Sequence, residues 1–333
     1  MRVAINGFGR IGRLIFRIMD QDSDFEIVAI NDLTDAEQLA YLLKYDTAHR
    51  LYRKEEISFE GDMLVVGDKK IKVLSEKDPA LLPWKELNVD LVYECTGLFT
   101  SEEKAKAHIE AGAKKVVISA PAKGNVKTVV YNVNHDILTK EDKIISAASC
   151  TTNCLAPVLN VIDKEFGITS GYMTTVHAYT NDQANLDVAH KKGIYARRGR
   201  ASAANIVPTS TGAASAIGKV IPSLDGKLSG MAMRVPVITG SVVDLVLKLK
   251  REVTKEEINE VLKNNQNETL GYTTDPIVSS DVIGMSYGSL VDGLLTSVNK
   301  TEDGELVKII AWYDNEMSYS YQMVRCAKYF LSL

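Results

Sequence analysis

The feature that most constrains this chain is a glycine pattern, Gly-x-Gly-x-x-Gly, at residues 7–12. It follows a short apolar run at 3–5 that is typical of a buried strand, and residues 13–19 continue with helical character. A second strand-like run at 26–30 leads to Asp32. In this context the pattern indicates a strand–turn–helix unit that binds a dinucleotide, because the glycines permit a tight turn, close approach of a pyrophosphate and close helix packing. The alternative is a glycine-rich turn without a ligand.

Asp32 predicts which dinucleotide is bound. It lies at the distance from the glycines that is expected for a carboxylate binding the adenosine ribose hydroxyls, and its charge would repel a 2′-phosphate. The sequence therefore favours NAD over NADP, with the phosphates at the N-terminus of the helix that follows the glycines.

The rest of the first half alternates between strand-like and helical segments. Strand-like runs occupy 90–95, 115–119 and 128–132, and a capping box at 100–103 opens a helix that reaches about residue 111. This alternation predicts an α/β fold with a doubly wound, mostly parallel sheet, that is, a Rossmann-type domain over residues 1–149.

A second feature is Cys150, within a small and polar segment at 146–154 that follows a strand-like run at 143–145. The capping residues around it predict that a helix begins at or near Cys150. Backbone N–H groups and the positive end of the helix dipole favour a thiolate there, which makes Cys150 a candidate nucleophile. The alternative is a small buried thiol, and this is how we interpret Cys154 and Cys95.

His177 is the candidate base for that cysteine, delivered by a strand-like run at 171–180. The polar stretch from 180 to about 205 carries several lysines and arginines. It is compatible with a solvated surface, a nucleic-acid patch or an anion site beside the active site. A hydroxyl-rich helix start at 209–214 also suits a phosphate.

The later segments predict a different kind of sheet. Strand-like runs at 231–235 and 242–249, a capped helix at 254–264 and a turn at Asp303-Gly304 between 294–298 and 306–312 suggest hairpins and a largely antiparallel sheet. We therefore expect an α+β catalytic domain over residues 150–315, and a C-terminal helix over 316–333 that packs back on the first domain.

Composition limits the class of protein. A chain of 333 residues has room for two domains, and a net charge of -4 argues against a general nucleic-acid binder. Four irregularly spaced cysteines indicate a reducing compartment and do not form a zinc pattern. The sequence has no signal-like N-terminus and no apolar run of membrane-spanning length, so we expect a cytoplasmic protein without a membrane partner and without a metal. His49, His108 and His135 are interpreted as structural or surface residues.

Four segments resemble one family. They read Ala-Ile-Asn-Gly-Phe-Gly-Arg-Ile-Gly-Arg at 4–13, Ala-Ser-Cys-Thr-Thr-Asn-Cys at 148–154, Thr-Val-His-Ala-Tyr-Thr at 175–180 and Trp-Tyr-Asp-Asn-Glu at 312–316. Together they are similar to the phosphorylating glyceraldehyde-3-phosphate dehydrogenases, and the similarity runs the whole length of the chain. The resemblance implies that Cys150 is the nucleophile, that His177 is its base partner, and that NAD is the cofactor.

The resemblance also implies the other site residues. On the cofactor side they are Gly7, Gly9, Arg10, Ile11, Gly12 and Asp32, with Lys77 near the adenine, and Ser119 and Asn315 on the nicotinamide side. The site for the substrate's own phosphate would include Thr180 and Arg234, and that for inorganic phosphate Ser149, Thr151, Arg198, Thr211 and Gly212. The basic polar stretch becomes a loop that packs across a homotetramer interface, which displaces the nucleic-acid interpretation.

The implied reaction is oxidation of glyceraldehyde 3-phosphate through a hemithioacetal and a thioester on Cys150, followed by attack of inorganic phosphate to give 1,3-bisphosphoglycerate. Two alternatives stay open at this point. One is an erythrose-4-phosphate dehydrogenase on the same scaffold, in which water releases the acyl group. The other is a catalytically idle scaffold or surface adhesin that retains the fold.

Overall fold

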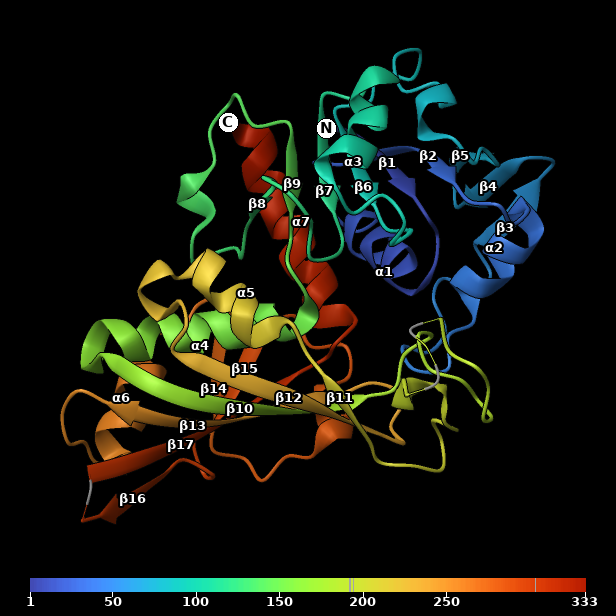
Figure 1. The fold of residues 1–333 in the computed structure, drawn as a ribbon. Helices are drawn as coiled ribbons and strands as arrows, with labels where there is room; N and C mark the ends of the chain where they lie inside the picture. Colours follow the sequence, from blue (N-terminus) through green and yellow to red (C-terminus); the bar gives the residue numbers. More distant parts are fainter. Residues whose placement is uncertain (192, 194, 303) are drawn as a thin grey trace. The chain divides into compact units, whose positions relative to one another are not determined.

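The chain folds into two compact units, described by a computed structural model that covers all residues except 192, 194 and 303 (Figure 1). The first unit is Met1–Ser149 together with Ser320–Leu333, and the second is Cys150–Tyr319.

The first unit contains a sheet of nine strands in the order β3-β4-β5-β2-β1-β6-β7-β9-β8. All pairs along it are parallel except β3 with β4 and β4 with β5. The elements are β1 (Arg2–Asn6), α1 (Arg10–Met19), β2 (Glu26–Asn31), α2 (Ala36–Lys44), β3 (Ile57–Glu60), β4 (Met63–Val66), β5 (Lys69–Leu74), β6 (Leu91–Glu94), α3 (Glu102–Glu110), β7 (Lys115–Ile118), β8 (Lys127–Thr128) and β9 (Ile144–Ser146).

Helices cover both faces of this sheet, as Figure 1 shows for α1 and α3 on either side of β1. Side chains alternate along β1, so that Ala4 packs in one core cluster with Ala105 of α3, while the side chain of Ile5 approaches Gly12 of α1. A mostly parallel sheet buried on both faces confirms the predicted doubly wound architecture.

Two local predictions for this unit need correction. The strand expected at 128–132 is only Lys127–Thr128, because the Asn134 side chain bonds the backbone of Thr128 and Val130 and turns the chain. The N-cap of α3 is Ser101, one residue into the predicted capping box. The helix α2 and the strands β3, β4 and β5 were not predicted.

The second unit contains a mixed sheet in the order β11-β12-β10-β13-β17-β15-β14, with β16 paired to β17. The pairs β10–β12 and β14–β15 are parallel and the other five are antiparallel. The elements are α4 (Cys150–Phe166), β10 (Ile168–Ala178), β11 (Val207–Ser210), α5 (Ala213–Val220), β12 (Leu228–Val235), β13 (Ser241–Leu249), α6 (Lys255–Asn264), β14 (Leu270–Thr273), β15 (Ser289–Asp292), β16 (Ser297–Thr301) and β17 (Gly304–Tyr313). The last helix, α7 (Met317–Ser332), begins in this unit and belongs to the first unit from Ser320 onward.

One face of this second sheet is covered by helices, with α4 lying along it and α5 and α6 beside α4 (Figure 1). Alternate residues of β13, namely Val243, Leu245 and Leu247, are buried, whereas Tyr172 on the opposite face is 72% exposed. The largely antiparallel character is confirmed. The capping box of α6 is confirmed at Thr254 and Glu257. The predicted turn at Asp303-Gly304 falls partly outside the described residues, although β16 and β17 do pair as a hairpin.

Five short 3-10 turns complete the described secondary structure, at Pro79–Leu81, His135–Ile137, Arg197–Gly199, Pro222–Leu224 and Ser279–Val282. Within the described part of the chain, no helix combines the length and the apolar character needed to cross a lipid bilayer.

Candidate active site

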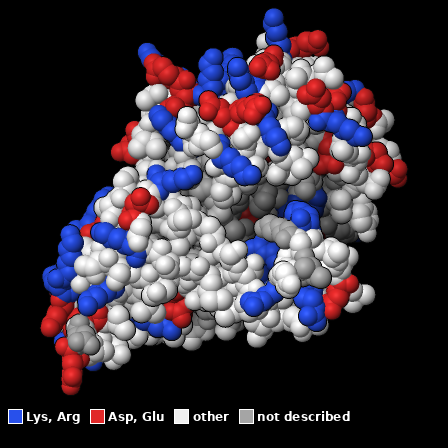
Figure 2. All heavy atoms as spheres, in the orientation of Figure 1, with Lys and Arg blue, Asp and Glu red and all other residues white. Residues whose placement is uncertain are grey.

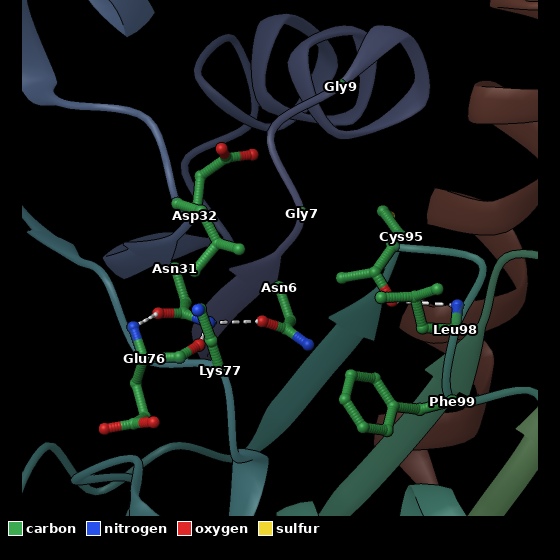
Figure 3. Close-up of a pocket in the computed structure, with 12 residues that line it drawn as sticks. Asn6, Gly7, Gly9, Asn31, Asp32, Glu76, Lys77, Cys95, Leu98 and Phe99 are labelled. Atoms are coloured by element: carbon green, nitrogen blue, oxygen red, sulfur yellow. Dashed lines mark hydrogen bonds between the residues drawn. The ribbon is translucent and has the colours of Figure 1, made fainter. Parts of the chain in front are cut away.

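A cavity of about 510 Å³ opens in the first unit at the carboxyl ends of its strands (Figure 3). It lies where the strand order reverses between β1 and β6, which is the place where doubly wound sheets bind ligands. The residues that line it come from the ends of β1, β2, β5 and β6 and the loops after them: Asn6, Gly7, Gly9, Asn31, Asp32, Leu33, Glu76, Lys77, Cys95, Thr96, Leu98 and Phe99. Cys95, which we predicted as a core residue, is therefore half-buried at the cavity wall.

The three glycines of the loop between β1 and α1 each meet a different constraint. Gly7 has a φ of +92°, and a Cβ there would lie 2.8 Å from the backbone N of Thr96. A Cβ on Gly12 would lie 2.2 Å from the carbonyl oxygen of Gly7. A Cβ on Gly9 would meet nothing within 4 Å. Gly7 and Gly12 are thus required by the fold, and Gly9 leaves free the space where a pyrophosphate would approach the start of α1.

The start of α1 is open to an anion. Its N-cap is Gly9, which offers no side-chain cap, and its first turn has no acidic residue. The next residue, Arg10, turns its side chain to Asp46 and His49, so Arg10 and Ile11 would contribute backbone N–H groups and not side-chain charge.

Asp32 lies at the cavity edge directly after β2. Its two oxygens accept hydrogen bonds from the backbone N–H of Phe8 (2.7 Å) and of Thr34 (3.0 Å). These bonds hold the carboxylate still and leave it further lone pairs for ribose hydroxyls. Lys77 is exposed on the same cavity, and Ser119 follows β7 in this unit.

In the second unit the structure brings Cys150 and His177 together. Cys150 is the first residue of α4, as the sequence predicted, and its Sγ lies 3.4 Å from Nε2 of His177 near the end of β10. The other ring nitrogen, Nδ1, lies 2.6 Å from the carbonyl oxygen of Ala178 and must donate to it. Nε2 is therefore the nitrogen that accepts a proton, and it faces the sulfur.

Burial controls the protonation of this pair. It raises the pKa of the Cys150 thiol, against the smaller opposing effects of the Arg234 charge and of hydrogen bonds from Thr151 and from the backbone at the helix start. It also lowers the pKa of His177, and the Arg234 charge lowers that pKa further. The backbone at the helix start does favour the thiolate, as the sequence predicted, but burial outweighs this effect. Activation requires His177 to accept the proton and form an ion pair with the sulfur.

Two arginines lie on the substrate side of this pair. Arg234 of β12 pairs in register with His177 of β10, and its Nη1 donates to Thr180 Oγ1 and to the Ala178 carbonyl, both at 3.1 Å. Arg198 donates to Thr209 Oγ1 at 3.2 Å and forms an ion pair with Asp182 at 2.7 Å. Burial lowers the pKa of Arg234, and the nearby positive charge of Arg198 lowers it further, so the two guanidinium groups act on the same region.

The hydroxyl groups predicted near phosphate lie at two helix starts. Thr151 is buried in the first turn of α4, directly after Cys150, and Ser149 precedes it at the end of the first unit. Thr211 and Gly212 lead into α5, whose N-cap Gly212 provides no side-chain cap. Each helix start can offer backbone N–H groups to an anion.

Asn315, expected on the nicotinamide side, follows β17 in the second unit. Its Oδ1 is held by the hydroxyl of Ser241 at 2.8 Å. This contact fixes the amide group and leaves its Nδ2 as the donor that a ligand can use.

Sequence reasoning missed Tyr313, although it lies in one of the four segments used for the resemblance. The side chain is fully buried, its hydroxyl lies 3.0 Å from that of Thr151 and 2.8 Å from that of Thr175, and its ring meets the His177 ring edge-on at 5.9 Å. Asn6 and Asn31 were also missed. Their signal was available, since both are polar residues at the carboxyl ends of predicted parallel strands.

Two further observations concern the acidic, basic and metal-ligating side chains. Among the described residues, no three His, Cys, Asp or Glu side chains are grouped so that they could hold a metal ion. On the face in Figure 2, acidic and basic side chains are interspersed over the upper part and the left edge, and much of the middle carries neither.

Comparison with known proteins gives matches along the whole chain. Residues 1–102 match the family model described as "Glyceraldehyde 3-phosphate dehydrogenase, NAD binding domain", and residues 149–315 match "Glyceraldehyde 3-phosphate dehydrogenase, C-terminal domain". Three curated proteins named glyceraldehyde-3-phosphate dehydrogenase are similar to it. They come from Clostridium pasteurianum (56% identical), Clostridium acetobutylicum (55%) and Streptococcus pyogenes (53%), and each alignment covers 100% of this chain and 99% of the relative.

Proposed function

The chain belongs to the glyceraldehyde-3-phosphate dehydrogenase family, and we propose that Cys150 and His177 carry its chemistry while the cavity of the first unit holds NAD. It is an NAD-dependent oxidoreductase that converts glyceraldehyde 3-phosphate and inorganic phosphate to 1,3-bisphosphoglycerate. The observation that carries the residue assignment is the 3.4 Å contact between Cys150 Sγ and the proton-accepting nitrogen of His177.

This contact determines the path of the thiol proton. His177 takes the thiol proton as the sulfur attacks the aldehyde carbon, and it returns that proton to the aldehyde oxygen to give the hemithioacetal. When that carbon is oxidised, His177 takes the same proton from the hydroxyl group, and Cys150 is left as a thioester. His177 is buried and Cys150 is half-buried, which limits the access of water to the thioester.

NAD, when bound, accepts the hydride. The residues present fit this cofactor: Gly9 leaves space against the start of α1, and Asp32 offers a fixed carboxylate at the cavity edge. We assign the backbone of Gly7, Gly9, Arg10, Ile11 and Gly12 to the pyrophosphate, Asp32 to the ribose, Lys77 to the adenine side, and Ser119 and Asn315 to the nicotinamide side.

We propose that the region around Arg198 and Arg234 in the second unit binds two phosphate groups. We assign Arg234 and Thr180 to the phosphate of the substrate, because the guanidinium is buried beside His177 and its Nε has no partner within the described residues. Inorganic phosphate, which attacks the thioester and releases the Cys150 thiolate, is assigned to Arg198 and to the helix starts at Ser149, Thr151, Thr211 and Gly212.

A homotetramer is part of the proposal. The outer face of the second sheet exposes Tyr172, and the polar stretch after it exposes Leu186 (79%) and Tyr195 (95%), an amount of apolar surface that suits contact with other copies. The cytoplasmic location expected from the sequence stays a prediction.

The test is the absorbance of reduced cofactor with glyceraldehyde 3-phosphate, for NAD and for NADP, each with and without inorganic phosphate. Fast NAD reduction that requires phosphate is expected. Turnover without phosphate would instead favour release of the acyl group by water, as in the erythrose-4-phosphate alternative. Absence of turnover with both cofactors would favour the alternative that the protein is a catalytically idle scaffold.

A further inference from the structure

A chain of hydrogen bonds between buried side chains runs beneath the cavity of the first unit. The indole Nε1 of Trp84 lies 3.0 Å from Nδ1 of His108, and Nε2 of His108 lies 2.9 Å from Oε2 of Glu94. The amide Nδ2 of Asn6 lies 2.6 Å from the same carboxyl oxygen. Trp84 and His108 are 0% exposed and Glu94 is 1% exposed.

The donors in this chain can be assigned from chemistry alone. An indole N–H can only donate, so Nδ1 of His108 must accept, and the proton of the neutral ring is on Nε2. His108 therefore donates to Glu94. The other oxygen of Glu94 accepts from the backbone N–H of Thr96 at 2.9 Å and from the Thr96 hydroxyl. All partners that the described residues give this carboxyl group are neutral donors, so both of its oxygens act as hydrogen-bond acceptors.

This carboxyl group fixes the groups above it. Because Glu94 takes the Nδ2 of Asn6, the Oδ1 of Asn6 is turned to Asn31 and accepts from its Nδ2 at 2.7 Å. Asn31 in turn donates to the Glu76 carbonyl at 2.8 Å and accepts from the Glu76 N–H at 2.9 Å. Figure 3 shows the links from Asn6 to Asn31 and on to Glu76, directly before Lys77.

The set reaches four walls of the cavity. Asn6 ends β1, Asn31 ends β2, Glu76 follows β5 and Thr96 follows β6, and all four line the cavity. We propose that Glu94 is a positioning residue for the dinucleotide: one buried carboxylate sets the hydrogen-bond direction of these four segments, and His108, held by Trp84, keeps it in place. The inference rests on the proposed assignment of this cavity to NAD.

The test is Glu94→Gln, which keeps the size of the side chain and replaces one acceptor by a donor. In either orientation the new NH2 group faces an existing donor, Thr96 on one side or Asn6 and His108 on the other. We expect Kd and KM for NAD to rise about tenfold, the loss of about one hydrogen bond to a charged group. The kcat at saturating NAD and the KM for glyceraldehyde 3-phosphate should stay within about twofold.

Matched variants separate this role from general damage. Glu110→Gln removes one exposed carboxylate from α3 and should leave KM for NAD unchanged. His108→Gln retains a donor toward Glu94 and should raise KM for NAD less than His108→Leu does. The comparison of the two His108 variants remains informative if Glu94→Gln folds poorly, which thermal unfolding would reveal.

Two outcomes overturn the proposal. One is a Glu94→Gln enzyme that is folded and has an unchanged KM for NAD. The other is an equal effect of His108→Gln and His108→Leu. Failure of the cofactor assignment itself is distinguishable, because then Asp32→Asn would also leave NAD binding unchanged.

Discussion

The two units hold charged ligands in opposite ways. The first offers a fixed carboxylate and uncapped backbone N–H groups, and most of these lie within residues 7–12 or directly after a parallel strand. The second offers half-buried arginines and a thiol–imidazole pair, and helix packing and strand register bring Cys150 of α4, His177 of β10 and Arg234 of β12 together. The residues of the first site therefore lie close together in the sequence or at strand ends that the sequence predicts, whereas those of the second site come together only when the right strands pair. The predictions below test whether binding and chemistry are as separable as this difference suggests.

The largest effect is expected for Cys150→Ser. A serine hydroxyl is much less acidic than a thiol and a weaker nucleophile, so dehydrogenase turnover should fall by at least about 10³-fold. NAD affinity should stay near that of the unchanged protein, because every residue of the first cavity is retained. Steady-state NADH formation and NAD titration by fluorescence measure the two properties.

Cys154→Ser is the matched control, one turn further along α4. Cys154 is fully buried, and its sulfur contacts Ser289 Oγ at 3.6 Å and the Ala311 carbonyl at 3.8 Å. It faces neither His177 nor Arg234 in any contact that the structure describes, so this variant should keep most of its turnover. Equal loss in both variants would contradict the assignment of the nucleophile.

A smaller but still large effect is expected for His177→Asn. Turnover should fall by about 10²- to 10⁴-fold, the usual contribution of a general base. Without its partner, Cys150 has a pKa raised by burial above the ordinary 9.0. The thiolate fraction at pH 7 is then small and grows about tenfold for each pH unit until the pH passes that pKa.

Iodoacetamide alkylation of Cys150 as a function of pH measures this directly. The unchanged protein should react readily at pH 7, because His177 can take the thiol proton. The variant should react slowly at pH 7 and approach the unchanged protein only above pH 9. Identical pH profiles would show that the helix start activates the sulfur without the histidine.

An intermediate effect is expected in the other unit for Asp32→Asn, which removes the charge and keeps the size. The ratio of kcat/KM for NAD to that for NADP should fall by about 10- to 100-fold, since charged hydrogen bonds to the ribose are lost and repulsion of a 2′-phosphate ends. Asp35→Asn, which changes the exposed N-cap of α2, is the control for net charge. If the ratio of the two kcat/KM values did not change, Asp32 would not determine the preference for NAD.

The sequence predicted the site of the first unit better than that of the second. The glycines, Asp32 and the helix start at Cys150 have local signals, so each lies where the pattern indicated. The burial that raises the pKa of Cys150 has no local signal, because it comes from residues up to about 160 positions away, such as Tyr313. Glu94 and His108 lie 14 residues apart in the chain and meet only through packing of α3 on β6, so His108 was interpreted as merely structural.

The smallest effects are expected for two variants of the glycine loop. Gly9→Ala should weaken NAD binding with almost no change in stability, whereas Gly12→Ala should lower the stability of the fold. At Gly9 the backbone has a φ of -73°, which alanine adopts without strain, and the added methyl group meets nothing within 4 Å. Reduced entropy of the unfolded chain stabilises by about 0.4–1 kcal/mol, and the poorer N-cap costs about as much, so the free energy of unfolding should change by less than about 0.5 kcal/mol. NAD affinity should nevertheless fall by about tenfold, because the methyl group occupies the approach of the pyrophosphate.

At Gly12 the same methyl group would lie 2.2 Å from the carbonyl oxygen of Gly7, so α1 must move away from β1. We expect a loss of about 1–3 kcal/mol in the free energy of unfolding, measured by urea titration without cofactor. If Gly9→Ala lost as much stability as Gly12→Ala, the open space beside Gly9 would belong to the fold and not to the ligand. If it kept both stability and NAD affinity, the pyrophosphate would have to bind elsewhere, and the first unit would lose the local signature that distinguishes it from the second.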